Sequence, residues 1–383
     1  MMFNNLVGGG AVFMIPKFGL KIIMKLSYSW AVLVSVVGTI VLYILHLIPD
    51  QYLIHVLLLT LLFSFCSINQ SALLGINKIH LYNFVGLIQA LILLISLLVF
   101  MILLHRIEII AYIYSLYISY TALFFTSLMP LLSEFKKGKT LNKKQILKEM
   151  LKYGFFIQIA NLVQLFNYRY IYYVIEFYLG KSSLGVFDVS NKLSEGIWLT
   201  PRSLATIQYS KISNSNDKEY ALKLTLAFLK LSSIATLAFI GIILFLPLTF
   251  FVSLFGVEFE GVKHIMLSLA PGIFAVSISM ILSHYFAGLG KYYINTITSS
   301  VGFVTLITLC VIFFPHATKY GNYHALFIAG LLVSAAYTLS VIIQFILFCK
   351  HTKIKFKSFL ITKEDVSIFS SEFKKMIATK SKA

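Results

Sequence analysis

Charged residues are scarce in this chain of 383 residues, because they make up only 12% of it, whereas water-soluble domains carry roughly 25%. Hydrophobic residues make up 59%. A water-soluble fold is therefore excluded. Apolar runs of about 20 residues, the length that crosses ~30 Å of hydrocarbon as a helix, recur along almost the whole sequence. These features predict an all-α integral membrane protein that crosses the bilayer many times.

Cysteine is also scarce. Cys66, Cys310 and Cys349 fall in or at the ends of apolar segments and lack the paired spacing of a zinc site or a disulfide framework. The sequence has no Walker motif, no cluster of metal ligands and no nucleophile with a base at a useful spacing. We therefore expect no cofactor, no metal and no enzymatic activity. A cleavable signal peptide is not evident, because the first long apolar segment is longer than a signal-peptide core.

The apolar runs, and the Lys, Pro, Gly and Asn residues that interrupt them, predict ten membrane-spanning helices. Four precede a long polar connection and six follow it. The predicted organisation is an N-terminal lobe (1–133), a basic linker (134–150), a C-terminal six-helix lobe (151–350) and a basic tail (351–383). The ten spans cover approximately residues 28–48, 52–74, 82–104, 109–132, 153–175, 184–208, 222–250, 262–287, 294–314 and 324–349.

The formal net charge of +18 comes mainly from lysines that lie between these spans, in alternate loops. Because the side of a membrane that is richer in Lys and Arg is normally the cytoplasm, we expect both termini and the linker to be cytoplasmic. The linker from Asn142 onward is compatible with an amphipathic interfacial helix that turns Ile146 and Leu147 towards lipid. Contacts with anionic membrane lipids account for the lysines, so no nucleic-acid partner is expected.

Polar side chains gather on two neighbouring predicted spans. At 100° per residue, those of span 153–175 fall within about 140° of arc and those of span 184–208 within about 100°. An ionised side chain at the bilayer centre costs ~2.5–3.5 kcal/mol on insertion scales, so such residues tend to face a partner or an aqueous cavity. We expect the two stripes to face each other. Their members are Gln158, Asn161, Gln164, Tyr168, Arg169, Tyr172 and Glu176 on the first span, and Asp188, Asn191, Lys192, Glu195, Arg202 and Thr206 on the second.

Two interpretations of these stripes stay open. In the structural one, Lys192 pairs with Asp188 and Glu195 along its own helix and the charges neutralise one another. In the functional one, a wet cavity attracts an anionic headgroup, and Glu195 and Asp188 balance the charge or couple transport to protons. Arg169 and Arg202 favour the second interpretation, because neither has an intrahelical acid in register. The predicted substrate-binding residues are Arg169, Lys192, Arg202, Asn161, Gln164 and Tyr168.

Several short motifs carry a family resemblance. They are Asn167-Tyr168-Arg169, Leu184-Gly185-Val186-Phe187, Ser194-Glu195 with Trp198 and Pro201, Lys211-Ile212-Ser213, and later Phe259-Glu260-Gly261 and Tyr285 to Lys291. With these motifs the chain resembles the O-antigen and polysaccharide flippases of the multidrug, oligosaccharidyl-lipid and polysaccharide exporter superfamily, which is related to multidrug and toxin extrusion transporters. Relatives often carry an acidic residue two positions after Arg169, where this chain has Ile171.

The resemblance implies two six-helix lobes in a V around a central cavity. It also implies flipping of an undecaprenyl-diphosphate-linked oligosaccharide, such as an O-antigen or capsule repeat unit, from the cytoplasmic to the periplasmic leaflet of a bacterial inner membrane. The resemblance further implies that a proton or sodium gradient drives this transport and that polysaccharide polymerase machinery is a partner. Since only four spans precede the linker, the resemblance implies that the family's first two helices are lacking and that residues 1–25 correspond to the loop after them.

Three alternatives remain beside the flippase. A multidrug or cation antiporter of the same superfamily is expected to carry an acidic residue in its first lobe, and the first four predicted spans contain no Asp or Glu. A membrane-embedded polysaccharide polymerase or ligase generally presents a large external loop, whereas the external connections predicted here are short. A non-functional remnant of a flippase is the third alternative.

Overall fold

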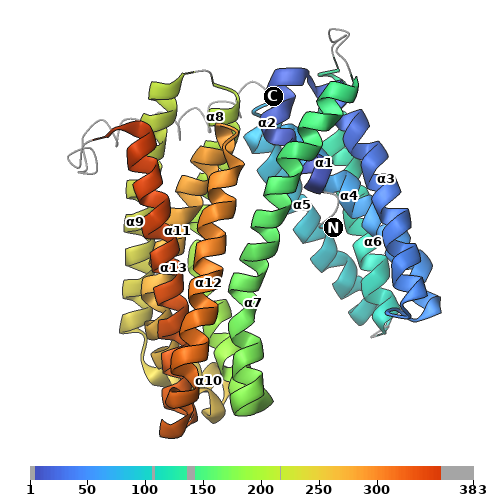
Figure 1. The fold of residues 1–383 in the computed structure, drawn as a ribbon. Helices are drawn as coiled ribbons and strands as arrows, with labels where there is room; N and C mark the ends of the chain where they lie inside the picture. Colours follow the sequence, from blue (N-terminus) through green and yellow to red (C-terminus); the bar gives the residue numbers. More distant parts are fainter. Residues whose placement is uncertain (1–4, 106–107, 136–142, 216, 355–383) are drawn as a thin grey trace. The chain divides into compact units, whose positions relative to one another are not determined.

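The computed structural model describes residues 5–105, 108–135, 143–215 and 217–354, and each regular element within these ranges is a helix (Figure 1). Eight of the predicted spans correspond to helices that are long and apolar enough to cross a membrane. The expected all-α integral membrane fold is therefore confirmed. These helices are Leu20–Ile44, Asp50–Gly75, Ile79–Leu103, Ile109–Leu132, Lys218–Phe245, Val257–Gly288, Tyr292–Tyr320 and Asn322–Thr352.

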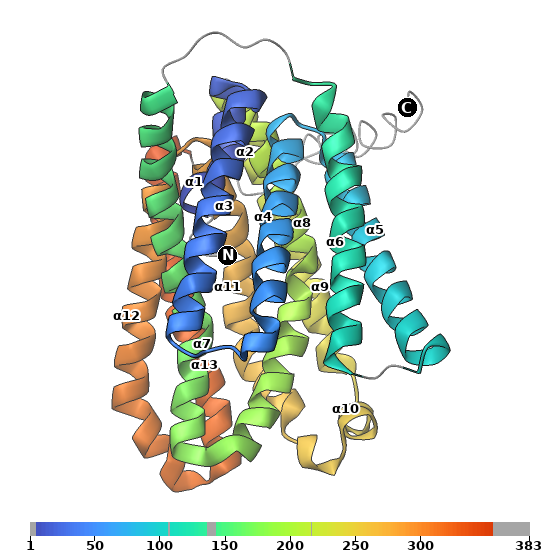
Figure 2. The same ribbon diagram turned by 90° about the vertical axis from the view of Figure 1, so that its right-hand side faces the viewer.

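The chain divides into two compact units, Met1–Gln158 (unit 1) and Ile159–Ala383 (unit 2). The division falls inside helix α7 (Lys143–Glu195). Figure 2 shows the helices of each unit from a second direction. Unit 1 comprises α1 (Asn5–Gly8), α2 (Ala11–Phe18), α3 (Leu20–Ile44), the turn Asp50–Tyr52, α4 (Leu53–Gly75), α5 (Ile79–Leu98) with a π-helical turn Val99–Leu103, α6 (Ile109–Leu132) and the start of α7.

The opening segment is helical and packed, so the prediction that residues 1–25 form a loop is wrong for its described part. The apolar run at the start of α2 buries its side chains, and Phe13 and Ile15 are each only 4% exposed. Gly75 at the end of α4 makes room for Ile15, because a Cβ on Gly75 would lie 2.9 Å from Ile15 Cδ1. The first long span also begins earlier than predicted, at Leu20.

The start of α7 is amphipathic, but its apolar side faces protein. Ile146 and Met150, one turn apart, are 2% and 1% exposed, whereas Lys148 is exposed. The ring of Tyr153 contacts that of Phe13 in α2, with 5.2 Å between centroids. The expectation that Ile146 faces lipid is therefore wrong, because α2 and its neighbours bury this side of α7. Residues 136–142 of the predicted linker lie outside the described residues.

Polar groups inside unit 1 join its helices. Asn69 of α4 is fully buried; its side chain accepts a hydrogen bond from the Tyr28 hydroxyl of α3 and donates one of 3.0 Å to Ser127 Oγ of α6. At the end of the same helices Lys78 forms an ion pair of 2.8 Å with Glu134. Interhelical hydrogen bonds of this kind hold membrane helices together. The polar residues of α4 therefore act in packing.

Unit 2 contains most of the two predicted spans with the polar stripes, the first of which begins in unit 1. The first span lies in α7 before Gly180. The second runs from the part of α7 after Gly180 into α8. Neither span is among the eight apolar helices, because their polar side chains lower the mean hydropathy. Gly180 interrupts α7 with φ 79° and ψ 177°, backbone angles that favour glycine. The remaining elements are the turn Gly196–Trp198, α8 (Leu199–Ser213), α9 (Lys218–Phe245), α10 (Leu248–Phe255), the turn Val257–Phe259, α11 (Val262–Gly288), α12 (Tyr292–Ala317), the turn Thr318–Tyr320 and α13 (Asn322–Thr352).

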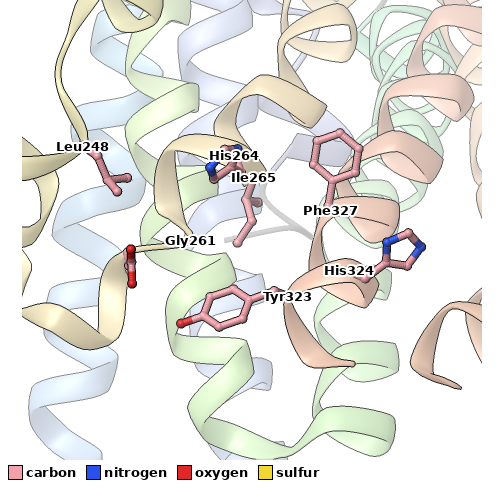
Figure 3. Close-up of a pocket in the computed structure, with 8 residues that line it drawn as sticks. Leu248, Gly261, His264, Ile265, Tyr323, His324 and Phe327 are labelled. Carbon is pink, nitrogen blue, oxygen red and sulfur yellow. The ribbon is translucent and has the colours of Figure 1, made fainter. Parts of the chain in front are cut away.

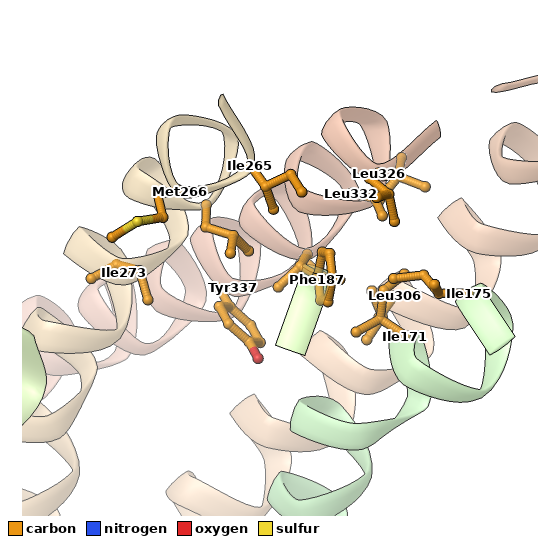
Figure 4. Packing of buried hydrophobic residues seen from close by; sticks show 14 of the residues in the cluster. Ile171, Ile175, Phe187, Ile265, Met266, Ile273, Leu306, Leu326, Leu332 and Tyr337 are labelled. Atoms are coloured by element: carbon orange, nitrogen blue, oxygen red, sulfur yellow. The ribbon is translucent and has the colours of Figure 1, made fainter. Parts of the chain in front are cut away.

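The core of unit 2 lies among α7, α11, α12 and α13. Phe187 and Leu306 are almost completely buried there, and Figure 4 shows them among aliphatic side chains of the neighbouring helices. Small residues let α11 and α13 approach closely. The Gly272 N–H donates to Ser334 Oγ at 3.1 Å, and that hydroxyl donates to the Ser268 carbonyl at 2.7 Å. Cys66 of unit 1 and Cys310 of unit 2 are buried and unpaired, as the sequence predicts.

Candidate functional site

A hydrogen-bonded chain joins the two polar stripes within unit 2. The Asn191 side-chain amide donates to the Tyr172 hydroxyl at 2.8 Å, across the break at Gly180. The same amide donates to Glu195 Oε1 at 2.7 Å. The two stripes therefore meet at Asn191, and this residue holds both the tyrosine and the carboxylate in place.

Two arginines of the stripes are exposed, and neither has an acid partner among the described residues. Arg169 lies over the Tyr172 ring, with 5.2 Å from its guanidinium carbon to the ring centroid. Arg202 is exposed on α8. Within the part of the chain that the structure describes, no carboxylate lies within 4 Å of either guanidinium. Both groups therefore keep their hydrogen-bond donors for another ligand, which a planar guanidinium binds best as a carboxylate or phosphate.

Glu195 is linked to Tyr172 through Asn191. Asn191 links the Glu195 carboxylate to the Tyr172 hydroxyl, and the Tyr172 ring packs against that of Phe187 with 5.8 Å between centroids. Glu195 is half-buried. The stripes thus combine one half-buried carboxylate with two exposed guanidinium groups. An anion can bind at the guanidinium groups, and a cation can bind at the carboxylate.

Lys192 is neutralised within its own helix, as the structural interpretation of the stripe supposed. Its ammonium group forms an ion pair of 2.6 Å with Asp188 Oδ2, one turn earlier. Lys192 does not pair with Glu195 as that interpretation expected, because Lys192 binds Asp188 and Glu195 accepts a hydrogen bond from Asn191 instead. Because the Lys192 side chain remains 65% exposed, the ion pair is solvated and contributes little to stability.

An aromatic wall stands behind the charged groups. The Tyr168 ring contacts the rings of Trp198 and Tyr337, with centroid separations of 5.7 Å and 5.9 Å. The buried Trp198 indole N–H donates to the Ile273 carbonyl of α11 at 3.0 Å, so the wall is anchored to the core. Trp198 and Tyr337 are themselves buried and hold the Tyr168 ring in place, and the Tyr168 side chain is partly exposed.

The other two predicted binding residues differ from each other. Gln164 Oε1 accepts a hydrogen bond of 3.0 Å from Ser299 Oγ, and the neighbouring Asn167 donates to the Ser299 carbonyl at 2.9 Å. Gln164 therefore ties α7 to α12. Asn161 is exposed, two turns from Tyr168 along α7. The structure thus links Glu195, Asn191, Tyr172 and Arg169 by direct contacts, and Gln164 joins α7 to α12.

One candidate was missed in the sequence. Lys230 lies inside α9 and is only 8% exposed. A lysine within an apolar span is expensive and marks a functional position by default, and its place inside the predicted span 222–250 was the available signal. Among the described residues no group of three or more His, Cys, Asp or Glu side chains is placed to hold a metal ion.

No family model matches the sequence, and no curated protein matches it. Solved structures do match. A MATE transporter in complex with MaD5 has a TM-score of 0.75 at 14% identity, with 91% of this chain and 84% of that chain covered. A MOP superfamily transporter from Pyrococcus furiosus has 0.74 at 16% identity, with the same coverage. A mutant of a Vibrio cholerae MATE transporter has 0.70 at 12% identity, covering 94% and 87%.

The chain has the MATE transporter fold. This fold accounts for the many long apolar helices. At these identities the likeness concerns the fold. The four-plus-six organisation with a V-shaped cavity, the absence of two helices, and the substrate stay predictions.

Proposed function

We propose that this protein flips an undecaprenyl-diphosphate-linked oligosaccharide from the cytoplasmic to the periplasmic leaflet of a bacterial inner membrane, with both of its termini in the cytoplasm. The observation that carries the proposal is the pair of exposed guanidinium groups of Arg169 and Arg202, without a carboxylate partner among the described residues, beside the aromatic wall. Membrane transport itself is supported by the MATE-like fold.

The chemistry of the site suits such a substrate. A diphosphate sugar is too polar to cross hydrocarbon unaided, because each unpaired polar group costs several kcal/mol there. Arg169 and Arg202 supply charge-assisted hydrogen bonds to phosphate oxygens, and Tyr168 offers a ring face to the first sugar. The polyprenyl chain stays in lipid. Glu195 repels the anion and sets where between the arginines it rests, and it is the group we assign to charge balance or proton coupling.

A multidrug or cation antiporter is the second candidate. The observation that favours it is Glu195, a half-buried carboxylate that Asn191 links to Tyr172, because a carboxylate beside an aromatic ring suits an organic cation. One structure with the same fold is described as a multidrug resistance MATE family transporter. Because the arginines outnumber this carboxylate and are more exposed, an anionic ligand is favoured at this site. The fold is one found in transporters, which does not favour the polymerase or ligase alternative.

Complementation tests the proposed function. The full chain, expressed in a strain that lacks its polysaccharide flippase and makes a matching precursor, is expected to restore surface polysaccharide. Restoration is expected to fall at least about tenfold in Arg169→Ala and in Arg202→Ala, since each loses a charge-assisted contact of ~1.5–3 kcal/mol. Surface polysaccharide is measured by immunoblot at equal protein levels in the membrane.

The control is Lys319→Ala, which removes one exposed positive charge in the turn Thr318–Tyr320 of unit 2 and is expected to restore polysaccharide fully. A parallel strain without drug pumps reports ethidium efflux. Efflux that depends on Glu195, together with no restoration of polysaccharide, would replace the flippase proposal with the cation antiporter.

A further inference from the structure

A cavity of about 520 Å³ lies where α11 and α13 begin, at the end of unit 2 opposite to the end of α13 at Thr352. Figure 3 shows the side chains of Tyr323, Phe327 and His264 around it. Its volume falls in the range of small-molecule sites, roughly 300–1,000 Å³. The lysine pattern of the loops predicts that this end faces the periplasm. The lining residues are Leu248, Glu260, Gly261, His264, Ile265, Tyr323, His324 and Phe327.

Two polar side chains that line the cavity are available for hydrogen bonds to a ligand. Glu260 and His264, one turn apart, are exposed, and their side chains form no hydrogen bond or ion pair within the described part of the chain. Lys263 between them is already used, because its ammonium group donates to the Leu246 carbonyl at 2.8 Å and holds the turn before α10. The lining contains one carboxylate, two imidazoles and no lysine or arginine.

A glycine positions the aromatic side of the cavity. A Cβ on Gly261 would lie 2.7 Å and 2.8 Å from two ring atoms of Tyr323. Gly261 has φ −71° and ψ −12°, which any residue adopts, so glycine is needed here for space rather than for backbone shape. Tyr323 nevertheless remains 60% exposed. One edge of its ring is thus fixed against the start of α11, and much of its surface stays open to a ligand.

We propose that this cavity is a carbohydrate-binding site, separate from the arginine stripe. The apolar C–H face of a sugar ring packs on an aromatic ring such as Tyr323, while vicinal hydroxyls donate to the Glu260 carboxylate and exchange hydrogen bonds with His264 and His324. A phosphate is disfavoured, because Glu260 repels it and no cation lines the wall. The proposal rests on the proposed function only for the source of the sugar. That source would be the oligosaccharide headgroup of the transported lipid after it has reached the outer leaflet.

Saturation-transfer NMR on the full chain in detergent tests this site directly. The probes are glucose, galactose, mannose, rhamnose, fucose and N-acetylglucosamine, each at millimolar concentration, and tetraphenylphosphonium as an organic cation. We expect transfer to the C–H protons of at least one sugar. The transfer is expected to fall at least fivefold in Glu260→Gln and in Gly261→Ala, which displaces the Tyr323 ring. Tyr323→Leu removes the ring and serves if Gly261→Ala fails to fold.

The matched control is Glu258→Gln, the same chemical change at an exposed glutamate outside the cavity lining, and it is expected to bind like the parent chain. No transfer to any of the sugars, or transfer that is unchanged in Glu260→Gln, would overturn the proposal. Binding of tetraphenylphosphonium alone, lost in Glu260→Gln, would overturn it in favour of a cation site. Sugar binding that survives in Arg169→Ala with Arg202→Ala separates this cavity from the transport stripe, so either proposal can fail without the other.

Discussion

Gly272→Val is expected to destabilise unit 2 by ~3 kcal/mol or more, beyond the usual cost of overpacking a core. A Cβ on Gly272 would lie 2.7 Å from Ser334 Cα, which is backbone and cannot rotate away. The added side chain therefore forces α11 and α13 apart. Their separation also breaks the bond from Ser334 Oγ to the Ser268 carbonyl and the bond from the Gly272 N–H to Ser334 Oγ.

The contact between α11 and α13 is built from two matching pairs. Ser268 and Gly272 on α11 are four positions apart, as are Gly330 and Ser334 on α13. Each glycine faces the serine of the other helix, since a Cβ on Gly330 would lie 1.9 Å from Ser268 Oγ. This is the small-residue pattern that brings membrane helices together where burial from water supplies no driving force.

Gly241→Val is the matched control. Gly241 lies in α9, another membrane-spanning helix, and a Cβ there has no atom within 4 Å outside its own helix backbone. We expect Gly241→Val to melt close to the parent chain, as measured by the loss of the monodisperse peak after heating in detergent. Gly272→Val is expected to give no monodisperse peak or a midpoint lower by at least about 5 °C. Equal midpoints for the two variants would contradict the close packing described here.

Replacement of both Arg169 and Arg202 by alanine is expected to weaken binding of a diphosphate-linked lipid ~100-fold. Each lost charge-assisted contact costs ~1.5–3 kcal/mol, and 1.4 kcal/mol corresponds to tenfold in affinity, so about tenfold per arginine is a conservative expectation. The measurement is equilibrium binding of a fluorescent undecaprenyl-diphosphate disaccharide to the purified chain in detergent. Affinity is also expected to fall as salt rises, because exposed charges are screened.

Two further variants separate charge from geometry. Arg169→Lys with Arg202→Lys keeps both charges but loses the planar fork, and is expected to bind between the parent chain and the double alanine variant. Lys319→Ala removes a charge outside the stripe and is expected to bind normally. If the double alanine variant binds within twofold of the parent chain, the arginines do not hold the diphosphate.

Much of the fold follows from the sequence because lipid demands long apolar helices, and these are visible as runs in the printed chain. The same rule failed for residues 5–18. Helix α2 is buried but too short to be recognised as a membrane span, and Gly75, which packs against its Ile15, is distant in sequence. The close approach of α11 and α13 could not be predicted either, because Gly272 packs against Ser334, 62 positions later in the sequence.

The candidate site was predictable in its composition but not in its pairings. Helical periodicity placed Arg169, Glu195 and Arg202 on polar faces, and the structure links Arg169 and Glu195 through Tyr172 and Asn191. Periodicity could not decide whether Glu195 accepts a hydrogen bond from Asn191 or forms an ion pair with Lys192, because Asn191 and Lys192 lie on the same helix face. The role of Gln164 depends on Ser299, 135 positions later, which no local pattern reveals.

The most direct test is the movement of the lipid itself. A fluorescent undecaprenyl-diphosphate oligosaccharide in vesicles that contain the purified chain is quenched by an impermeant reductant, which reports the leaflet it occupies. We predict that the chain speeds exchange between leaflets at least about tenfold over protein-free vesicles, and that Arg169→Ala with Arg202→Ala removes this increase. Exchange at the protein-free rate, or an equal increase with the double variant, would contradict the account.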